Sequence, residues 1–244
     1  MIETLNNIDT QIFLFFNGMH CPFFDTFMSM FTGRFIWVPM YATILLLLFR
    51  NFEWRRATIY VIAIILTITL ADQICASVIR PLVERMRPSN PDNPLSEFVH
   101  IVNGYRGGRY GFPSCHGANS FGLAVLLTLI IRQWRFSIFI IGWAVLNSYS
   151  RLYLGVHYPG DLLVGAAIGS IAAVICYLAA QEAARLVTNR RHHPKAHATF
   201  TVPFGLNFEN SVIRVSYVTL RINDVMIIAG AVTVLVIIGS SILG

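Results

Sequence analysis

Charged side chains are scarce in this sequence. Asp, Glu, Lys and Arg make up 12% of the 244 residues, and hydrophobic residues make up 55%. A soluble domain usually carries about 25% charged residues. The deficit, with a mean hydropathy of +0.62, argues against a soluble protein and predicts one that crosses a membrane several times. The net charge of +6 is, in a membrane protein, more typical of basic cytoplasmic loops than of nucleic-acid binding. We therefore expect a membrane, and no nucleic acid, among its partners.

The sequence also lacks the patterns of disulfide-rich, metal-binding and secreted proteins. Its four cysteines are scattered and show neither a disulfide framework nor metal-ligand spacing. Three histidines in a basic tract resemble a metal site, but their surroundings favour a solvated tail; they are His192, His193 and His197. No basic residue precedes Arg34, so the start of the chain lacks the basic region of a signal peptide. No metal or other cofactor is expected.

Long uncharged segments are what the sequence has instead. Six segments predict membrane-spanning helices: 35–49, 57–79, 114–131, 136–149, 161–180 and 225–244. A span needs about 20 apolar residues, so the first needs its flanking turns to cross the membrane. Together the segments predict an all-α integral membrane protein, a bundle of about six transmembrane helices. Gly165 and Gly169, set among small residues, should let a second helix approach closely.

One acid interrupts the apolar segments. Asp72 lies in the second predicted helix, where a charge is costly and usually faces the inside of the bundle. We favour a structural hydrogen bond to a neighbouring helix. The alternative is support for Arg80, which follows the end of that predicted helix.

Composition divides the chain into four parts. Residues 1–32 are aromatic-rich but interrupted by polar residues, which indicates either an interfacial amphipathic segment or ordinary packing on the bundle. Residues 33–180 are the five-helix membrane core. Residues 181–224 are a basic insert, in which the stretch 199–222 is rich in Val, Thr and Phe and favours a small β-rich element. Residues 225–244 are the sixth transmembrane helix.

Basic residues set the expected orientation in the membrane. The loop 50–56, the turn 132–135 and the stretch 181–224 are basic and are expected in the cytoplasm. The connection 80–113 and the loop 150–160 then lie on the opposite face, which is periplasmic in a bacterium. The sequence thus predicts a multi-pass protein of the bacterial inner membrane with its site on the periplasmic face and both termini on the outer side.

Three segments that meet on this outer face carry a candidate site. Arg80 and Arg87 follow the second predicted helix, the run 113–116 opens the third, and Arg151 precedes the fifth. Helix starts suit anions because their backbone N–H groups are unpaired and lie at the positive end of the helix dipole. Arginines bind phosphate through forked hydrogen bonds. Three arginines with few carboxylates nearby would repel one another unless an anion joined them, so the pattern predicts a phosphate site.

Two histidines on the same face indicate catalysis. His157 lies four residues before Asp161, so the carboxylate can reach one ring nitrogen across the helix start. The other ring nitrogen is then left as a nucleophile. His116, on the facing helix, can donate a proton to a leaving oxygen. An unperturbed pKa of about 6.5 allows histidine either protonation state near neutral pH.

The order and spacing of these residues resemble the signature of a known family. The three runs are Arg80-x6-Arg87-Pro88, Pro113-Ser114-Cys115-His116 and Ser150-Arg151-x5-His157-x3-Asp161. They resemble the motifs of the type-2 phosphatidic acid phosphatase superfamily, which includes bacterial lipid phosphatases, glucose-6-phosphatase, class A acid phosphatases and vanadium haloperoxidases. The chain departs from the usual pattern twice. Arg80 stands where the family usually has lysine, which keeps the charge, and Cys115 stands where it usually has glycine.

The resemblance implies a metal-independent lipid phosphatase. His157 would attack phosphorus and form a phosphohistidine, Asp161 would orient it, and His116 would protonate the leaving group and then activate water. The groups that would hold the phosphate oxygens are Arg80, Arg87, Arg151, Ser114 and the Cys115 amide. The implied substrate is a lipid phosphate: undecaprenyl diphosphate, a lipid A phosphate, phosphatidylglycerophosphate or phosphatidic acid.

Four other interpretations stay open from the sequence. Cys115 could be the nucleophile, since a thiol at a helix start can have a lowered pKa. A vanadate-dependent haloperoxidase would share the anion pocket, a non-catalytic lipid-binding protein would keep it without turnover, and a phosphotransferase would pass the phosphate to an alcohol. In the connection 80–113, four residues would form the rim of the site and contact the headgroup: Tyr105, Arg106, Arg109 and Tyr110. The two arginines among them would meet either a second phosphate or ordinary anionic lipids.

Overall fold

Helices make up most of the computed structural model, which describes residues 2–33, 35–188, 199–209 and 212–243. The α-helices are α1 (Ile2–Asn17), α2 (Pro22–Phe31), α3 (Val38–Asn51), α4 (Trp54–Gln73), α5 (Arg80–Val83), α6 (Cys115–Ile131), α7 (Trp134–Tyr153), α8 (Pro159–Thr188) and α9 (Ile222–Leu243). A π-helical segment, η1 (Ile74–Ile79), joins α4 to α5, and two short 3-10 turns, η2 (Pro94–Phe98) and η3 (Val102–Gly104), lie in the connection before α6.

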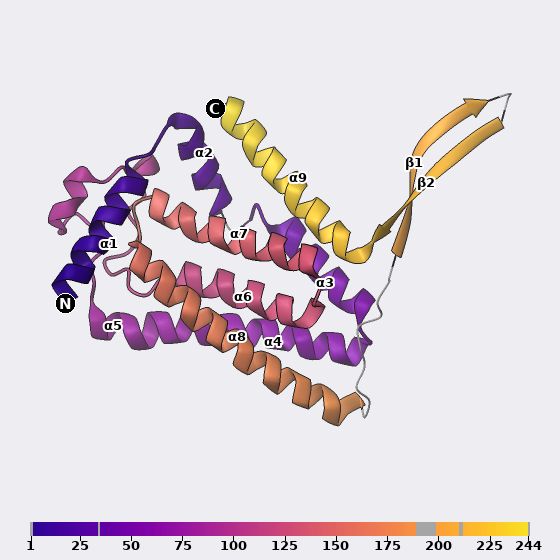
Figure 1. Ribbon diagram of the computed structural model, residues 1–244, viewed down its shortest axis with the longest axis horizontal. Helices are drawn as coiled ribbons and strands as arrows, with labels where there is room; N and C mark the ends of the chain where they lie inside the picture. Colours follow the sequence, from indigo (N-terminus) through magenta and orange to yellow (C-terminus); the bar gives the residue numbers. More distant parts are fainter. Residues whose placement is uncertain (1, 34, 189–198, 210–211, 244) are drawn as a thin grey trace.

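The centre of the bundle is α6, which packs against α4, α7 and α8 (Figure 1). Its contact with α8 is close because two glycines face it. A Cβ atom added to Gly165 would clash with the carbonyl oxygen of Ser114, and one added to Gly169 would clash with that of Ala118. The close helix approach predicted for this glycine pair is therefore confirmed. It brings the starts of α6 and α8, which carry two of the predicted motifs, next to each other.

The second predicted helix ends later than expected. α4 continues through η1 into α5 and stops only at Glu84, which has a left-handed backbone with φ of 49°. Arg80 therefore lies on the helix and not after it. Hydropathy falls at Arg80, but backbone hydrogen bonding continues until a residue leaves the helical conformation. The drop in hydropathy marked a change of environment and not the end of the helix.

The fourth and fifth predicted helices are also longer in the structure. α7 runs to Tyr153, so Ser150 and Arg151, which were expected in a loop, lie in its last turn. Both are buried by neighbouring segments, which fixes this turn. α8 runs to Thr188, so the first residues of the predicted insert are helical. Gln, Glu, Ala, Arg and Leu dominate that stretch, and all are good helix formers.

Several helices have the length and composition of membrane spans. Among the described residues, three helices are long and apolar enough to cross a membrane: Trp54–Val83, Pro159–Val187 and Asp224–Leu243. Two shorter apolar helices are Val38–Asn51 and Cys115–Ile131. The protein is thus a membrane protein with several apolar helices, as predicted. A total of six crossings stays a prediction.

The N-terminal helix α1 lies across the end of the bundle where α8 begins (Figure 1). Its outer side is apolar and exposed, with Leu5, Ile8, Ile12 and Phe15 at helical spacing. On its inner side Phe13 is fully buried, with its ring centroid 5.4 Å from that of Tyr158. The interfacial position expected for residues 1–32 stays a prediction, since α1 both packs on the bundle and exposes an apolar stripe.

Two strands precede α9. β1 (Thr199–Glu209) and β2 (Val212–Arg221) pair antiparallel, with an irregularity in register between Pro203 and Gly205. They lie at the end of the bundle opposite the start of α8 (Figure 1). Their cytoplasmic location stays a prediction. The three histidines considered as a metal tract lie outside the described residues.

Candidate active site

A cavity of about 820 Å³ lies among α3, α4, α6 and α7. Six of the eight residues predicted for the site line it: Arg80, Arg87, Cys115, His116, Arg151 and His157. The other two, Ser114 and Asp161, are fully buried. The structure therefore brings side chains from all three motif segments to one cavity.

In the described part of the chain, two arginines of the cavity donate hydrogen bonds to carbonyl, thiol and hydroxyl groups and to no carboxylate. Arg80 Nη2 donates to the carbonyl oxygen of Pro113 at 3.1 Å and to Cys115 Sγ at 3.0 Å. Arg151 Nη2 donates to the Tyr105 hydroxyl at 3.0 Å. The Nε atoms of both arginines are buried and have no hydrogen-bond partner in the described part of the chain. Neither guanidinium forms an ion pair with a described carboxylate.

The third arginine, Arg87, is held by backbone. Its Nε donates to the carbonyl oxygen of Tyr110 at 3.1 Å and its Nη1 to that of Val156 at 3.0 Å. Burial and the positive charges of the two other arginines lower its pKa to about 10. The group is still charged at neutral pH. Because the other two arginines disfavour the positive charge of Arg87 in this way, an anion that neutralises the three groups together is favoured.

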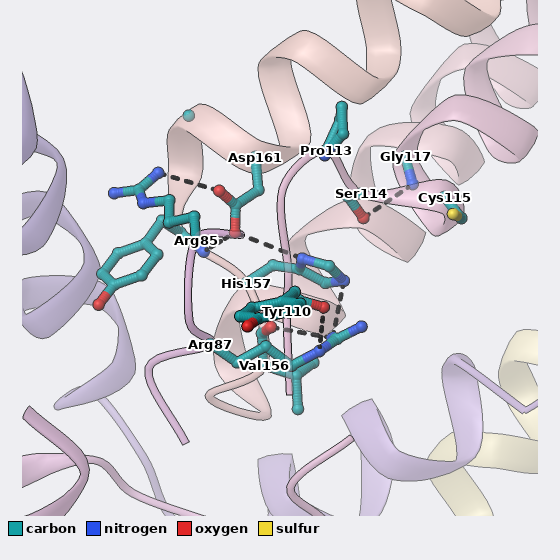
Figure 2. A network of polar contacts seen from close by, with 12 residues as sticks. Arg85, Arg87, Tyr110, Pro113, Ser114, Cys115, Gly117, Val156, His157 and Asp161 are labelled. Carbon is teal, nitrogen blue, oxygen red and sulfur yellow. Dashed lines mark hydrogen bonds and ion pairs between the residues drawn. The ribbon is translucent and has the colours of Figure 1, made fainter. Parts of the chain in front are cut away.

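His157 is held between a cation and a carboxylate (Figure 2). It is 1% exposed, and its Nε2 lies 3.0 Å from Arg87 Nη1. Its Nδ1 lies 3.4 Å from Asp161 Oδ2, close enough for an ion pair but without the alignment of a hydrogen bond. Burial and the three neighbouring arginines hold the pKa of His157 well below its usual value. The ring is thus neutral near pH 7, and the Arg87 contact makes Nε2 the acceptor and Nδ1 the protonated nitrogen.

Asp161 is fixed by groups on both of its oxygens. The Tyr158 amide donates to Oδ2 at 3.0 Å, and Arg85 Nη1 donates to Oδ1 at 2.9 Å. Arg85 Nη2 forms an ion pair with Asp9 Oδ2 at 2.7 Å. Sequence reasoning missed both Arg85 and Asp9. Arg85 lies inside the interval between the two arginines of the first motif, and Asp9 lies in a helix outside every motif, so spacing gave neither a role.

The start of α6 is tied to the start of α8. Ser114 is the N-cap residue of α6, and its Oγ accepts from the Gly117 amide at 3.3 Å. The Ser114 amide donates to the carbonyl oxygen of Asp161 at 3.0 Å. Ser114 therefore serves the helix start and does not line the cavity, and its expected phosphate contact stays a prediction. His116 follows in the first turn of α6 and lines the cavity.

The predicted rim residues separate in the structure. Tyr105 lines the cavity, whereas Arg106 and Arg109 do not. Arg106 Nη1 donates to the carbonyl oxygen of Ser89 at 2.7 Å, which closes the connection on itself. The Arg109 side chain is 60% exposed and lies 4.0 Å from Asp92. Contact of these two arginines with a second phosphate or with anionic lipids stays a prediction.

The cavity becomes less polar along the bundle. Below the arginines, Asn119 Nδ2 donates to Asp72 Oδ1 at 3.2 Å, and Asn147 Nδ2 donates to Ser120 Oγ at 2.6 Å. The first of these bonds is the link to a neighbouring helix that we favoured for Asp72. Farther along, the lining is mainly apolar and includes Ile44, Ile64, Ile68, Leu123 and Trp143. A cationic end, a polar belt without arginines and an apolar end suit a phosphorylated amphiphile.

Comparison with known proteins agrees with this geometry. A family model described as the PAP2 superfamily matches residues 57–185. This chain belongs to the PAP2 superfamily. The matched region contains every residue predicted for the site, from Arg80 to Asp161, and the resemblance seen in the three motifs is confirmed. The PAP2 match leaves out α1, and with it Asp9.

Individual PAP2 relatives are also similar over much of this chain. A protein named lipid A 4'-phosphatase from Bacteroides thetaiotaomicron is 61% identical over 182 residues, which is 75% of this chain and 81% of the relative. One of the same name from Porphyromonas gingivalis is 34% identical over 177 residues, 72% of this chain and 74% of the relative. The crystal structure of Aquifex aeolicus LpxE has a TM-score of 0.52 and 26% identity and covers 68% of this chain and 93% of that one. This PAP2 chain is a membrane lipid phosphatase.

Proposed function

We propose that this phosphatase removes a phosphate group from lipid A through a phosphohistidine on His157. The observation that carries the mechanism is the neutral, buried His157, whose Nε2 lies 3.0 Å from the Arg87 guanidinium at the wall of a cationic cavity. The substrate is supported by the names of the two relatives from Bacteroides thetaiotaomicron and Porphyromonas gingivalis.

In the first step His157 Nε2 attacks phosphorus. The bond from Nε2 to phosphorus forms while the ester bond from phosphorus to the sugar oxygen breaks, and His116 gives its proton to that oxygen. Arg80, Arg87 and Arg151 hold the remaining phosphate oxygens. Their contribution is positioning and charge stabilisation, as is usual in phosphoryl transfer.

Asp161 supports the nucleophile throughout this step. As Nε2 bonds to phosphorus the ring becomes positively charged, and the carboxylate 3.4 Å from Nδ1 stabilises that charge. In the second step His116 takes a proton from water, the water oxygen attacks phosphorus, and the bond from phosphorus to nitrogen breaks. Phosphate leaves, and His157 returns to its neutral form.

The polar belt supports a sugar lipid over a prenyl lipid. Asp72 forms no ion pair with a described residue, and the Oδ1 atom of Asn119 has no hydrogen-bond partner in the described part of the chain. Both are acceptors, so they suit a substrate with N–H or O–H donors near its phosphate. An acylated glucosamine unit carries such donors. In a prenyl diphosphate the phosphate joins the hydrocarbon directly.

The active site is proposed to lie on the periplasmic face of the inner membrane. The residues of the site gather where α6 and α8 begin, and the basic turn between α6 and α7 lies at the other end of α6. Basic turns favour the cytoplasmic side, so the site end is the outer one. A phosphate at headgroup depth would enter the cationic end of the cavity, with acyl chains along its apolar part.

A phosphate-release assay tests the proposal. Detergent-purified protein in excess chelator would be given lipid A, undecaprenyl diphosphate, phosphatidylglycerophosphate and phosphatidic acid, with His157→Ala as the matched control. We expect release from lipid A that is absent in the variant. Release from another lipid alone would refute the substrate, and equal release by the variant would refute the nucleophile. Lipid binding without any release would favour a non-catalytic protein, and vanadate-dependent halide oxidation would favour a haloperoxidase.

A further inference from the structure

A continuous chain of polar contacts, which begins with two ion pairs, runs from the N-terminal helix to the nucleophile. Asp9 of α1 pairs with Arg85 Nη2 at 2.7 Å, and Arg85 Nη1 pairs with Asp161 Oδ1 at 2.9 Å. Asp161 Oδ2 then lies 3.4 Å from His157 Nδ1. Figure 2 shows the last part of this chain, with Arg85 on one side of the Asp161 carboxylate and His157 on the other.

These contacts are mostly shielded from solvent. The side chains of Asp9 and Arg85 are 15% and 20% exposed, and that of Asp161 is not exposed at all. The guanidinium carbon of Arg85 lies 3.9 Å from the centroid of the Tyr158 ring, which fixes its plane. Exposed ion pairs contribute little to stability, because salt screens them and their side chains are mobile. Salt and side-chain mobility weaken these partly buried pairs less.

Asp9 has a second contact that anchors it to the same site. Its Oδ1 accepts a hydrogen bond from the Gly160 amide at 2.8 Å, in the first turn of α8. A Cβ atom added at Gly160 would lie only 2.8 Å from Asp9 Oδ2, so a larger residue there would displace the Asp9 carboxylate. Asp9 thus holds the arginine that contacts Asp161 and also the backbone that carries Asp161.

The division of the Asp161 oxygens has a chemical consequence. Arg85 occupies Oδ1, which leaves Oδ2 for the Tyr158 amide and for His157 Nδ1. Without Arg85 the carboxylate could turn, and its charge would act on His157 without a compensating cation. We propose that Arg85, held in place by Asp9, is a positioning residue that fixes the Asp161 carboxylate and thereby the nucleophilic form of His157. This proposal rests on the proposed role of His157.

The experiment measures kcat and KM for lipid A across pH with Arg85→Ala, Arg85→Lys and Asp9→Asn. We expect Arg85→Ala to lower kcat by about 10- to 100-fold with a smaller change in KM, the usual range for groups that orient a catalytic ligand. Arg85→Lys should recover part of the rate, because lysine restores the charge but not the fork. Asp9→Asn, which keeps the side-chain volume, should lower kcat less.

The pH profile distinguishes a positioning role of Arg85 from an effect on the stability of the protein alone. Neutral His157 is the active form, so the rate falls as pH drops through its pKa. Removing the Arg85 charge raises that pKa, and the acidic limb of the profile should move to higher pH. A simple loss of folded protein would lower the rate equally at every pH. Arg185→Ala is the control. It breaks an exposed ion pair with Glu182 on the same helix as Asp161 and should change neither the rate nor the pH of the acidic limb.

A double-mutant cycle and His157→Ala complete the design. If Asp9 acts through Arg85, Asp9→Asn should have little further effect on kcat in the Arg85→Ala background. Wild-type kcat in Arg85→Ala, or an unmoved acidic limb in that variant, would overturn the inference while an inactive His157→Ala still upheld the proposed function. An active His157→Ala would instead overturn the proposed function.

Discussion

The two sides of the cavity differ in how their polar atoms are paired. On the side of His157, Asp161 contacts Arg85 and the Tyr158 amide, and Arg85 is bonded in turn by Asp9. Among the described residues, His157 Nδ1 has only its 3.4 Å contact with Asp161. On the opposite side, Arg80 and Arg151 each keep a buried Nε without a hydrogen-bond partner in the described part of the chain.

This difference separates preorganisation from binding. The nucleophile must be held in one geometry before the substrate arrives, so its supports are bonded within the protein. The other arginines must bond to phosphate oxygens that change position during the reaction. A buried donor without a partner costs about 1–3 kcal/mol, and a bound phosphate can relieve that cost. Substitutions on the two sides test whether one side orients the nucleophile and the other binds the phosphate.

The largest effect is expected on the preorganised side. His157→Ala should lower phosphate release from lipid A by about 10⁴-fold or more, because the nucleophile is lost. The measurement is kcat of purified protein, with thermal unfolding as the control. If His116→Ala lost its activity while His157→Ala kept it, the two roles would be exchanged: His116 would be the nucleophile and His157 the proton donor.

The next largest effect is expected among the opposite arginines. Arg151→Ala should lower kcat/KM by about 10²–10³-fold, the usual result of removing one transition-state donor. Arg151→Lys should recover little, because an ammonium group cannot replace two forked N–H bonds. The inhibition constant for vanadate, a phosphate mimic, measures the same loss of anion binding independently. Unchanged vanadate inhibition in both variants would exclude Arg151 from the anion site.

A smaller effect on rate, but a diagnostic one on pH, is expected for Arg87, which touches both sides. Arg87→Gln should lower kcat/KM by about 10²-fold. It should also move the acidic limb of the pH profile upward by about one unit, because His157 loses a nearby positive charge. The limb reports His157, since the rate needs its neutral form. A limb that moved downward would contradict the arrangement in which Arg87 lowers the pKa of His157.

The cationic side could be predicted from the sequence because spacing alone reveals it. Arg80, Arg87, Arg151 and both histidines lie in local motifs next to apolar segments, and convergence on one membrane face followed from counting the helices. The supports of the nucleophile could not be predicted in the same way. Arg85 and Asp9 meet only after α1 folds across the bundle, and such a contact leaves no periodicity or spacing in the chain.

The fold divides along similar lines. Hydropathy located the apolar segments, but it placed the ends of α5, α7 and α8 too early, because buried polar residues and good helix formers extend helices beyond the apolar part. The two glycines of α8 were interpreted correctly because small residues act through their size alone. Ser114 is predicted to contact phosphate, and that contact stays a prediction; the role of its hydroxyl as the cap of α6 was not foreseen, because residue type alone does not distinguish these uses.

The smallest effect is expected deepest in the cavity, where the polar belt is proposed to recognise donors of the substrate. Asn119→Leu keeps the volume but removes an acceptor that is unpaired in the described part of the chain. One lost hydrogen bond of about 1.4 kcal/mol corresponds to a tenfold change, so KM for lipid A should rise about tenfold with kcat nearly constant. Inhibition by phosphatidic acid, which has no donor near its phosphate, should weaken less.

Thr67→Val is the matched control, because Thr67 is buried on α4 but does not line the cavity. If KM for lipid A and the inhibition constant for phosphatidic acid rose by the same factor, Asn119 would only support the helix contact with Asp72. The arginines would then have to discriminate between the substrates.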